Sequence, residues 1–296
     1  AASDVYKRQE YIPGVFMFIK GKINLGDLRT EVGDTLKRVR PAVRRNKKTV
    51  VAGLMLLLLA GIAYAGPRAV VTASQNAMAA SKELPIYCVD RKDKVVALTF
   101  DAAWGNEDTQ QILDILEKHN VKVTFFATGG WVETYPEDVK KIIEAGHAFG
   151  NHSENHKFMT KLSDEQKKQE LMKVHDKVKA LTGYEMCLFR PPYGDYNDAV
   201  VRTAESLGYY TIQWSVDSLD WKDYGVDSII KTVTQHKNLD SGAIILMHNG
   251  AKYTADALDS VITNLKEQGY SFVTVAQLIH TGKYHIDHTG KQIADE

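Results

Sequence analysis

Residues 95–105 have the sequence VVALTFDAAWG, in which a continuous apolar run ends in an aspartate, Asp101. A short apolar run of this kind predicts a strand over residues 95–100. Such strands are typical of parallel sheets, because helices cover both faces of a parallel sheet. Apolar residues at helical spacing follow at residues 109–119, so the stretch predicts one strand and one helix of an α/β fold.

The same alternation continues to about residue 279. Seven strands are predicted, at residues 95–100, 121–127, 147–150, 186–189, 209–214, 243–247 and 271–275. Amphipathic helices are predicted at residues 109–119, 164–181, 198–207, 226–236 and 254–268. Strands that alternate with helices indicate an α/β fold with a parallel sheet. Seven such units favour a deformed (β/α) barrel over an open sheet, with the chemistry at the carboxyl ends of the strands.

Five of these strands end in side chains that can transfer protons, bind a metal or form ion pairs. The residues concerned are Asp101, His152, His156, Arg190, Asp217, Asp220 and His248. Each alone has an ordinary explanation, since an acidic residue after a strand is often a helix cap and a lone histidine is often structural. Because the carboxyl ends of barrel strands share one face, we expect these side chains to form one site.

Two of these residues, His152 and His156, are four positions apart. This spacing lets both imidazoles reach one metal ion if the segment is helical or tightly turned. The segment HSENH differs from HExxH, which excludes the zinc-protease motif with an internal glutamate base. Its place after a strand, opposite Asp101 in the predicted barrel, favours a metal pair.

Five segments resemble, in order and spacing, the motifs of the NodB-homology polysaccharide deacetylases, carbohydrate esterase family 4. They are TFD (99–101), NHSENH (151–156), RPPYG (190–194), DSLDW (217–221) and ILMH (245–248). The resemblance covers about residues 90–280, and the TFDAAWG form of the first motif looks like the branch common in spore-forming bacteria. It implies a deformed βα barrel that hydrolyses the acetamide of an N-acetylated sugar with the help of a metal ion.

The resemblance also implies a catalytic pair. Asp101 would be the general base that takes a proton from the attacking water, and Arg190 would orient it, although a structural ion pair would also explain this arginine. His248 would be the general acid that protonates the departing amine. Asp220 would raise the pKa of His248 by its charge and its hydrogen bond.

By the same resemblance, His152 and His156 would bind a divalent metal, with zinc as the expected ion, to polarise the acetyl carbonyl. The backbone N–H of Tyr193 would be a second donor to the oxyanion. Trp221 and Leu246 would form the apolar wall that receives the acetyl methyl group. Plain core packing would explain these last two residues equally well.

One position departs from the family pattern. A second aspartate completes the metal triad in the family, and this chain has Ala102 there. Two histidines should bind zinc more weakly than three protein ligands, unless an oxygen of Asn106, Glu107 or Glu154 substitutes. A second hypothesis is therefore a weak or inactive relative that binds cell-wall glycan in a structural or sporulation-associated role. The presence of the general acid, the general base and their supporting groups favours an enzyme over this binding protein. A third hypothesis is a metallohydrolase that acts on another substrate, such as a cyclic amide.

The charges of the chain are unevenly distributed, although Lys+Arg and Asp+Glu both number 37. Residues 37–48, KRVRPAVRRNKK, contain seven basic residues, and residues 50–66 contain no charged residue over 17 positions. This length is at the lower end of the ~17–25 residues that span a bilayer as a helix. The basic flank predicts a cytoplasmic N-terminus and anionic lipid headgroups, rather than nucleic acid, as its partner.

These patterns predict four parts: a cytoplasmic basic arm (1–49), a transmembrane signal-anchor (50–66), a linker (67–83) and a catalytic domain (84–296). We expect a single-pass protein of the cell membrane whose catalytic domain is extracytoplasmic and acts on peptidoglycan or another N-acetylated polysaccharide. Secretion after cleavage near Ala65 is the alternative, because Ala63-Tyr64-Ala65 fits a signal-peptidase site. A disulfide between Cys88 and Cys187 would be chemically permitted outside the cell.

Overall fold

The apolar run that ends at Asp101 forms the central strand, β2 (Val95–Ala102), in which every residue is buried. Its neighbours β8 (Ala243–Asn249) and β3 (Thr124–Ala127) are both parallel to it. The structure, a computed structural model, describes residues 82–295. Asp101 lies opposite His248 in the register of β2 and β8, so the carboxyl ends of these strands bring an acidic and a basic side chain together.

The strands form one sheet of 11, in the order β10-β11-β1-β8-β2-β3-β4-β5-β6, with β7 also paired to β8 and β9 to β2. The remaining strands are β1 (Cys88–Val89), β4 (Ala148–Asn151), β5 (Leu188–Phe189), β6 (Tyr210–Thr211), β7 (Val216–Asp217), β9 (Ser271–Phe272), β10 (Tyr284–Ile286) and β11 (Lys291–Ala294). One isolated bridge, between Ile86 and Ile212, joins the end of β6 to the segment before β1.

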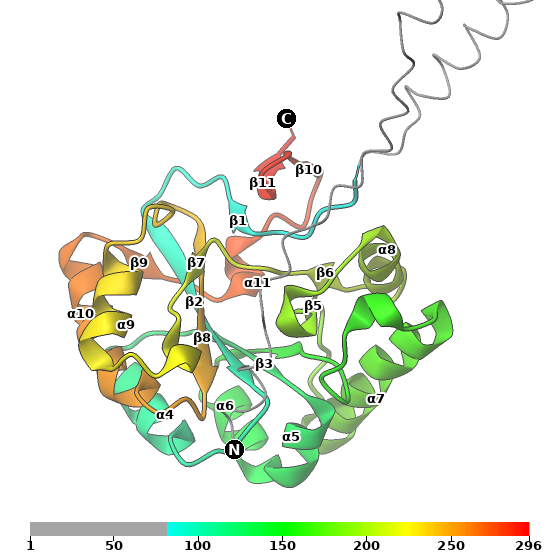
Figure 1. Ribbon diagram of the computed structural model, residues 1–296, viewed down its shortest axis with the longest axis horizontal. Coiled ribbons are helices and arrows are strands. Elements are labelled where there is room, and N and C mark those ends of the chain that lie inside the picture. Colours follow the sequence, from blue (N-terminus) through cyan, green and yellow to red (C-terminus); the bar gives the residue numbers. More distant parts are fainter. Residues whose placement is uncertain (1–81, 296) are drawn as a thin grey trace, which may run out of the picture. The chain divides into compact units, whose positions relative to one another are not determined.

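Helices surround the curled sheet in Figure 1. They are α4 (Thr109–Lys118), α5 (Gly129–Thr134), α6 (Pro136–Glu144), α7 (Asp164–Thr182), α8 (Asp198–Ser206), α9 (Val226–Thr234), α10 (Thr254–Glu267) and α11 (Val275–Leu278). Three short 3₁₀ turns lie in loops: η1 (Met159–Lys161), η2 (Pro192–Gly194) and η3 (Asp220–Lys222). Local chemistry sets the ends of α7, which starts at a capping box between Ser163 and Gln166 and stops at Gly183 with φ 74°.

The α/β prediction is confirmed, and one of its details is corrected. The sheet has 11 strands rather than about seven. It is curled like a half-barrel, and the bridge between Ile86 and Ile212 joins its β6 end to the segment before β1. All five predicted helices begin at the predicted residue and end within two residues of the predicted end. The prediction missed several short elements: α5, α6, α11, β1, β7, β10 and β11.

Side chains of β2 alternate between two apolar clusters on the two faces of the sheet. Val96, Leu98, Phe100 and Ala102 belong to the outer cluster, which lies between the sheet and the surrounding helices. Val95 and Ala97 belong to the inner cluster, enclosed by the curl together with side chains of α11. Because strand side chains alternate, Asp101 lies on the inner face with Ala97. The site is therefore built on the concave side of the sheet, at its carboxyl edge.

Among the helices of residues 82–295, none combines the length and the apolar character that crossing a membrane requires. The predicted arm (1–49), transmembrane segment (50–66) and nearly all of the predicted linker (67–83) lie outside the described residues, so these assignments stay predictions. Cys88 and Cys187 are both free thiols in the structure.

Candidate active site

Asp101 is held by Arg190, which follows β5. The Nη1 atom of Arg190 donates to Asp101 Oδ1 at 2.6 Å and to Thr99 Oγ1 at 2.9 Å, and its Nη2 atom donates to the carbonyl oxygen of Gln213 at 3.2 Å. The guanidinium is fully buried and lies 4.2 Å above the ring of Phe126. Burial acts to raise the pKa of Asp101, but Arg190 and the nearby histidines outweigh it and hold the pKa below its ordinary value. Asp101 is therefore an oriented, ionised carboxylate.

His152 and His156 direct their rings to one point beside Asp101. Their Nε2 atoms are 3.2 Å apart, and His152 Nε2 is 3.5 Å from Asp101 Oδ2. His152 Nδ1 donates to the carbonyl oxygen of Arg190 at 2.8 Å, which leaves its Nε2 with a lone pair. Burial lowers the pKa of His152 and lowers that of His156 to about 3, so both are neutral imidazoles suited to metal binding.

A tight turn, rather than a helix, brings these two histidines together. Ser153 and His156 have φ values of 63° and 51°, in the left-handed region. Asn151 anchors the turn, because its Oδ1 atom accepts the N–H of Ser153 at 2.9 Å and its Nδ2 atom donates to the carbonyl oxygen of Leu171 at 2.8 Å. The helical alternative for this segment is thus excluded, and the tightly turned one is what the structure shows.

His248 is paired with Asp220, a fully buried carboxylate at the start of η3. His248 Nδ1 donates to Asp220 Oδ1, and its backbone N–H donates to Asp220 Oδ2, both at 2.7 Å. Thr254, the first residue of α10, donates its hydroxyl to Asp220 Oδ2 at 2.7 Å. Burial acts to lower the pKa of His248, but the charge of Asp220 outweighs it and raises the pKa above its ordinary value. This pair can supply a proton at near-neutral pH.

The three residues expected at the substrate also lie at this edge. Tyr193, in η2, has φ 61°, and its ring contacts His156 at 4.5 Å between centroids. Leu246 precedes His248 by two residues, so both side chains share the concave face of β8. Trp221 follows Asp220 in η3. The structure thus brings every predicted site residue to one edge of the sheet, while their roles stay predictions.

Two of the expected metal ligands, His152 and His156, lie together, and no third one joins them. Within residues 82–295, no three histidine, cysteine, aspartate or glutamate side chains are grouped so that they could hold a metal ion. Ala102 contributes no ligand, and the proposed substitutes do not join the two imidazoles. Asn106 Nδ2 donates to Asp138 at 2.6 Å, and Glu154 Oε1 pairs with Lys177 at 2.6 Å. Glu107 packs its carboxylate against Gly105. The donor set fits a divalent ion held by two imidazoles.

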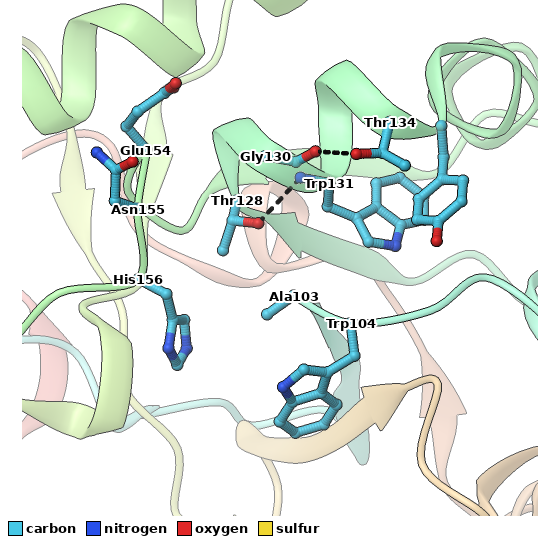
Figure 2. Close-up of a pocket in the computed structure, with 10 residues that line it drawn as sticks. Ala103, Trp104, Thr128, Gly130, Trp131, Thr134, Glu154, Asn155 and His156 are labelled. Atoms are coloured by element: carbon cyan, nitrogen blue, oxygen red, sulfur yellow. Dashed lines mark hydrogen bonds between the residues drawn. The ribbon is translucent and has the colours of Figure 1, made fainter. Parts of the chain in front are cut away.

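A pocket of about 380 Å³ opens beside His156 (Figure 2). Two loops, which follow β2 and β4, and helix α5 with its two capping residues provide the lining: Ala103, Trp104, Thr128, Gly130, Trp131, Thr134, Tyr135, Glu154, Asn155 and His156. The ring of Trp104 also stacks on that of His248, with 5.2 Å between centroids and 30° between planes. Since the pocket shares Trp104 and His156 with the site, aromatic and polar groups for a ligand lie next to the proposed acid and metal positions.

A half-buried carboxylate, Asp108, joins the loop after β2 to the end of β8. Asp108 Oδ1 accepts the backbone N–H of Gly250 at 2.8 Å and the side-chain amide of Asn249. Burial raises the pKa of Asp108 to about 6, although these hydrogen bonds act in the opposite direction. The loop after β2 carries Trp104 and the end of β8 carries His248, so Asp108 supports the stacking of these rings.

Several of the residues that support the site were not predicted from the sequence. Thr99 could have been found, because it lies two positions before Asp101 and therefore on the same face of the strand. Asp108 and Thr254 give no such signal, since polar residues at helix starts are ordinarily caps. Their contacts join segments that are far apart in the sequence, and only the fold shows them.

The chain is similar in sequence to a known protein family and to several named deacetylases. A family model described as polysaccharide deacetylase matches residues 89–212. The chain is 38% identical over 201 residues to a peptidoglycan-N-acetylmuramic acid deacetylase of Bacillus subtilis, which covers 65% of this chain and 74% of that protein. It is 40% identical over 207 residues to a peptidoglycan-N-acetylglucosamine deacetylase of Listeria monocytogenes, which covers 69% of this chain and only 43% of that longer protein.

A solved structure of a relative is also similar. A protein of Bacillus anthracis described as a CE4 family pseudoenzyme superimposes with a TM-score of 0.63 at 40% identity, over 66% of this chain and 68% of that one. A mutant of that pseudoenzyme is described as having restored enzymatic activity, and it superimposes with the same TM-score at 41% identity. The shared fold thus occurs in both active and inactive relatives.

Proposed function

This chain belongs to the polysaccharide deacetylase family, the NodB-homology domains of carbohydrate esterase family 4, and we propose that it removes acetyl groups from N-acetylated sugars of peptidoglycan or a chitin-like glycan. One observation carries the proposal. Asp101 and His248 lie opposite each other at the carboxyl ends of adjacent strands. Each is paired with an oppositely charged side chain, Asp101 with Arg190 and His248 with Asp220.

The proposed reaction is hydrolysis of an amide. Asp101 takes a proton from water, whose oxygen attacks the acetyl carbonyl carbon. His248 then donates a proton to the sugar nitrogen as the carbon–nitrogen bond breaks, so that acetate and a free amine leave. Arg190 keeps Asp101 ionised and oriented, and Asp220 keeps His248 protonated until the transfer.

During the attack, negative charge develops on the carbonyl oxygen, and hydrogen-bond donors must stabilise it. The backbone N–H of Tyr193 is the proposed donor, since two prolines precede it and cannot donate. A divalent ion held by His152 and His156 would polarise the same carbonyl when bound. The acetyl methyl group would lie against Trp221 and Leu246.

A second candidate is a glycan-binding protein with little or no activity. Ala102 supports it, because the family pattern has a metal ligand at this position. The description of the Bacillus anthracis relative as a pseudoenzyme also supports it. The sporulation-associated role belongs to this candidate, and the TFDAAWG form of the first motif is its sequence support.

Membrane attachment is a further part of the proposal. The apolar residues 50–66 and the basic residues 37–48 before them support a signal-anchor with the catalytic domain outside the cell. Cell fractionation with external protease tests it: the domain should sediment with membranes and be digested from outside. Recovery of the full-length chain in the soluble cytoplasmic fraction would refute the anchor.

Acetate release tests the choice between the two candidates. The full chain is incubated with N-acetylglucosamine oligomers or peptidoglycan, with zinc, cobalt or a chelator. An enzyme should release acetate in a metal-dependent manner, and Asp101→Asn should abolish the release. An inactive native chain that gains activity only through Ala102→Asp would establish the second candidate.

A further inference from the structure

Among residues 82–295, two large apolar side chains are exposed, Phe158 at 48% and Tyr224 at 65%. An exposed aromatic ring offers an apolar face on which a ligand can stack. Phe158 lies two residues after His156, and Tyr224 lies three residues after Trp221. Both rings are thus on loops that carry proposed site residues.

A continuous series of ring contacts joins Phe158 to the candidate active site. Its ring stacks on Tyr193, with 4.3 Å between centroids and 17° between planes. Tyr193 in turn contacts His156, whose ring lies 4.9 Å from that of His152. Phe158 therefore extends the aromatic surface of the site outward from the two histidines.

Tyr224 occupies a similar place on the other side. The ammonium of Lys222 lies 5.9 Å from the centre of the Tyr224 ring and 4.8 Å from that of Trp221, so one cation bridges the two rings. Trp221 directly follows Asp220, the partner of His248. Tyr224 therefore extends the aromatic surface outward from the proposed general acid.

The strand order places Asp101 and His248 between these two aromatic rings. Phe158 follows β4, and Tyr224 follows β7, with β8, β2 and β3 in between. Four strand spacings of ~4.8 Å separate β7 from β4, so the path along the sheet is on the order of 20 Å, and the curl makes the straight distance shorter. A single sugar ring cannot reach from one aromatic residue to the other, whereas consecutive sugars of one polymer can.

We propose that Phe158 and Tyr224 are glycan-binding residues that stack on sugars flanking the one held between Asp101 and His248. The apolar C–H face of a pyranose ring packs well on an aromatic face, and no fixed charge has to be desolvated. The ligand is therefore an oligosaccharide long enough to reach both rings. The inference rests on the proposed function for its substrate class, and it holds equally for an active enzyme and for an inactive glycan-binding protein.

Length-dependent binding tests this inference. The affinities of N-acetylglucosamine hexamer and dimer are measured by titration calorimetry on the full chain in mild detergent, with Asp101→Asn present throughout to prevent turnover. Phe158→Ala and Tyr224→Ala should each weaken hexamer binding about tenfold, equivalent to about 1.4 kcal/mol. Dimer binding should change less than twofold. Phe158→Tyr and Tyr224→Phe should keep the hexamer affinity, because they keep the rings.

Tyr284→Ala is the matched control, since it removes a partly buried tyrosine from β10 and should not alter the affinity. Equal hexamer affinity of all variants, an equal loss for dimer and hexamer, or no hexamer binding by the parent chain would each overturn the inference. A change from dimer to monomer in Phe158→Ala or Tyr224→Ala on sedimentation would also overturn it, because the rings would then contact a second copy. Failure of acetate release by the native chain, with length-dependent binding intact, would refute only the enzymatic proposal.

Discussion

The side chains of Asp101 and Ala102 lie on opposite faces of β2, although the two residues are neighbours in the chain. Asp101 is on the concave face, where Arg190 Nη1 contacts it at 2.6 Å. Ala102 is fully buried in the outer cluster of apolar side chains. An aspartate at position 102 would therefore place a carboxylate in apolar surroundings unless a metal ion drew it toward the two histidines.

The first prediction follows for Ala102→Asp. Without metal, the free energy of unfolding should fall by about 1–3 kcal/mol, because an unpaired carboxylate becomes buried. Zinc should restore it, by about 2.7 kcal/mol at a concentration one hundred times the dissociation constant. Urea unfolding with chelator and with zinc measures both effects. A zinc-dependent gain of the same size in the native chain would contradict the prediction.

Arg190→Gln should destabilise the fold by about 3–5 kcal/mol, because it leaves the carboxylate of Asp101 buried without its counter-ion. In the native chain the pKa of Asp101 is below the ordinary 3.8, so this carboxylate stabilises the fold above that pH and loses its effect as the pH falls through the folded pKa. The variant should have a raised pKa at Asp101, and the acidic limb of acetate release should move to higher pH. Arg202→Gln, which breaks an exposed pair of 3.9 Å, should change neither quantity.

Asp220→Asn should lower the pKa of His248, since the carboxylate is what raises it. In the native chain the raised pKa stabilises the fold at pH values below about 6.5, and this contribution disappears as the pH rises through the folded pKa. The variant loses that contribution, and the basic limb of acetate release moves to lower pH. Imidazole titration by NMR measures the shift directly. Asp295→Asn alters an exposed pair with His285 and serves as the control; a His248 pKa unchanged by Asp220→Asn would refute the assignment.

Asp108→Asn should stabilise the chain at alkaline pH. Burial raises the pKa of Asp108 from 3.8 to about 6, so its contribution to stability is present below the ordinary pKa and is lost as the pH rises through about 6. Asparagine can accept the same hydrogen bonds from Asn249 and Gly250 without a charge. The free energy of unfolding at pH 8 should rise by about 1–3 kcal/mol over the native value, with little difference at pH 4. Asp114→Asn, at an exposed site, is the control, and a loss of stability at pH 8 would contradict the prediction.

The sequence predicted the carboxyl edge of the sheet because catalytic side chains follow apolar runs, as Asp101 follows β2. It predicted five of the helices from apolar residues at helical spacing, as in α10. It could not predict the hairpin of β10 and β11, whose pairing partner β1 is remote in the sequence. The stacking of Phe158 on Tyr193 could not be predicted either, because the two loops meet only in the folded chain. The spacing of apolar residues shows which face of a helix or strand is buried, whereas contacts between loops depend on the whole fold.

The strand β1 has consequences for the order in which the domain can be completed. It lies between β8 and β11, and both partners are synthesised after it, the second at residues 291–294. Until residues 291–294 have been synthesised, the side of β1 that faces β11 has no partner, and an unpaired strand edge can join another chain. Folding of this edge must therefore follow synthesis of β11, and a chain released after α11 would keep an unpaired edge on β1 that β11 covers in the native domain.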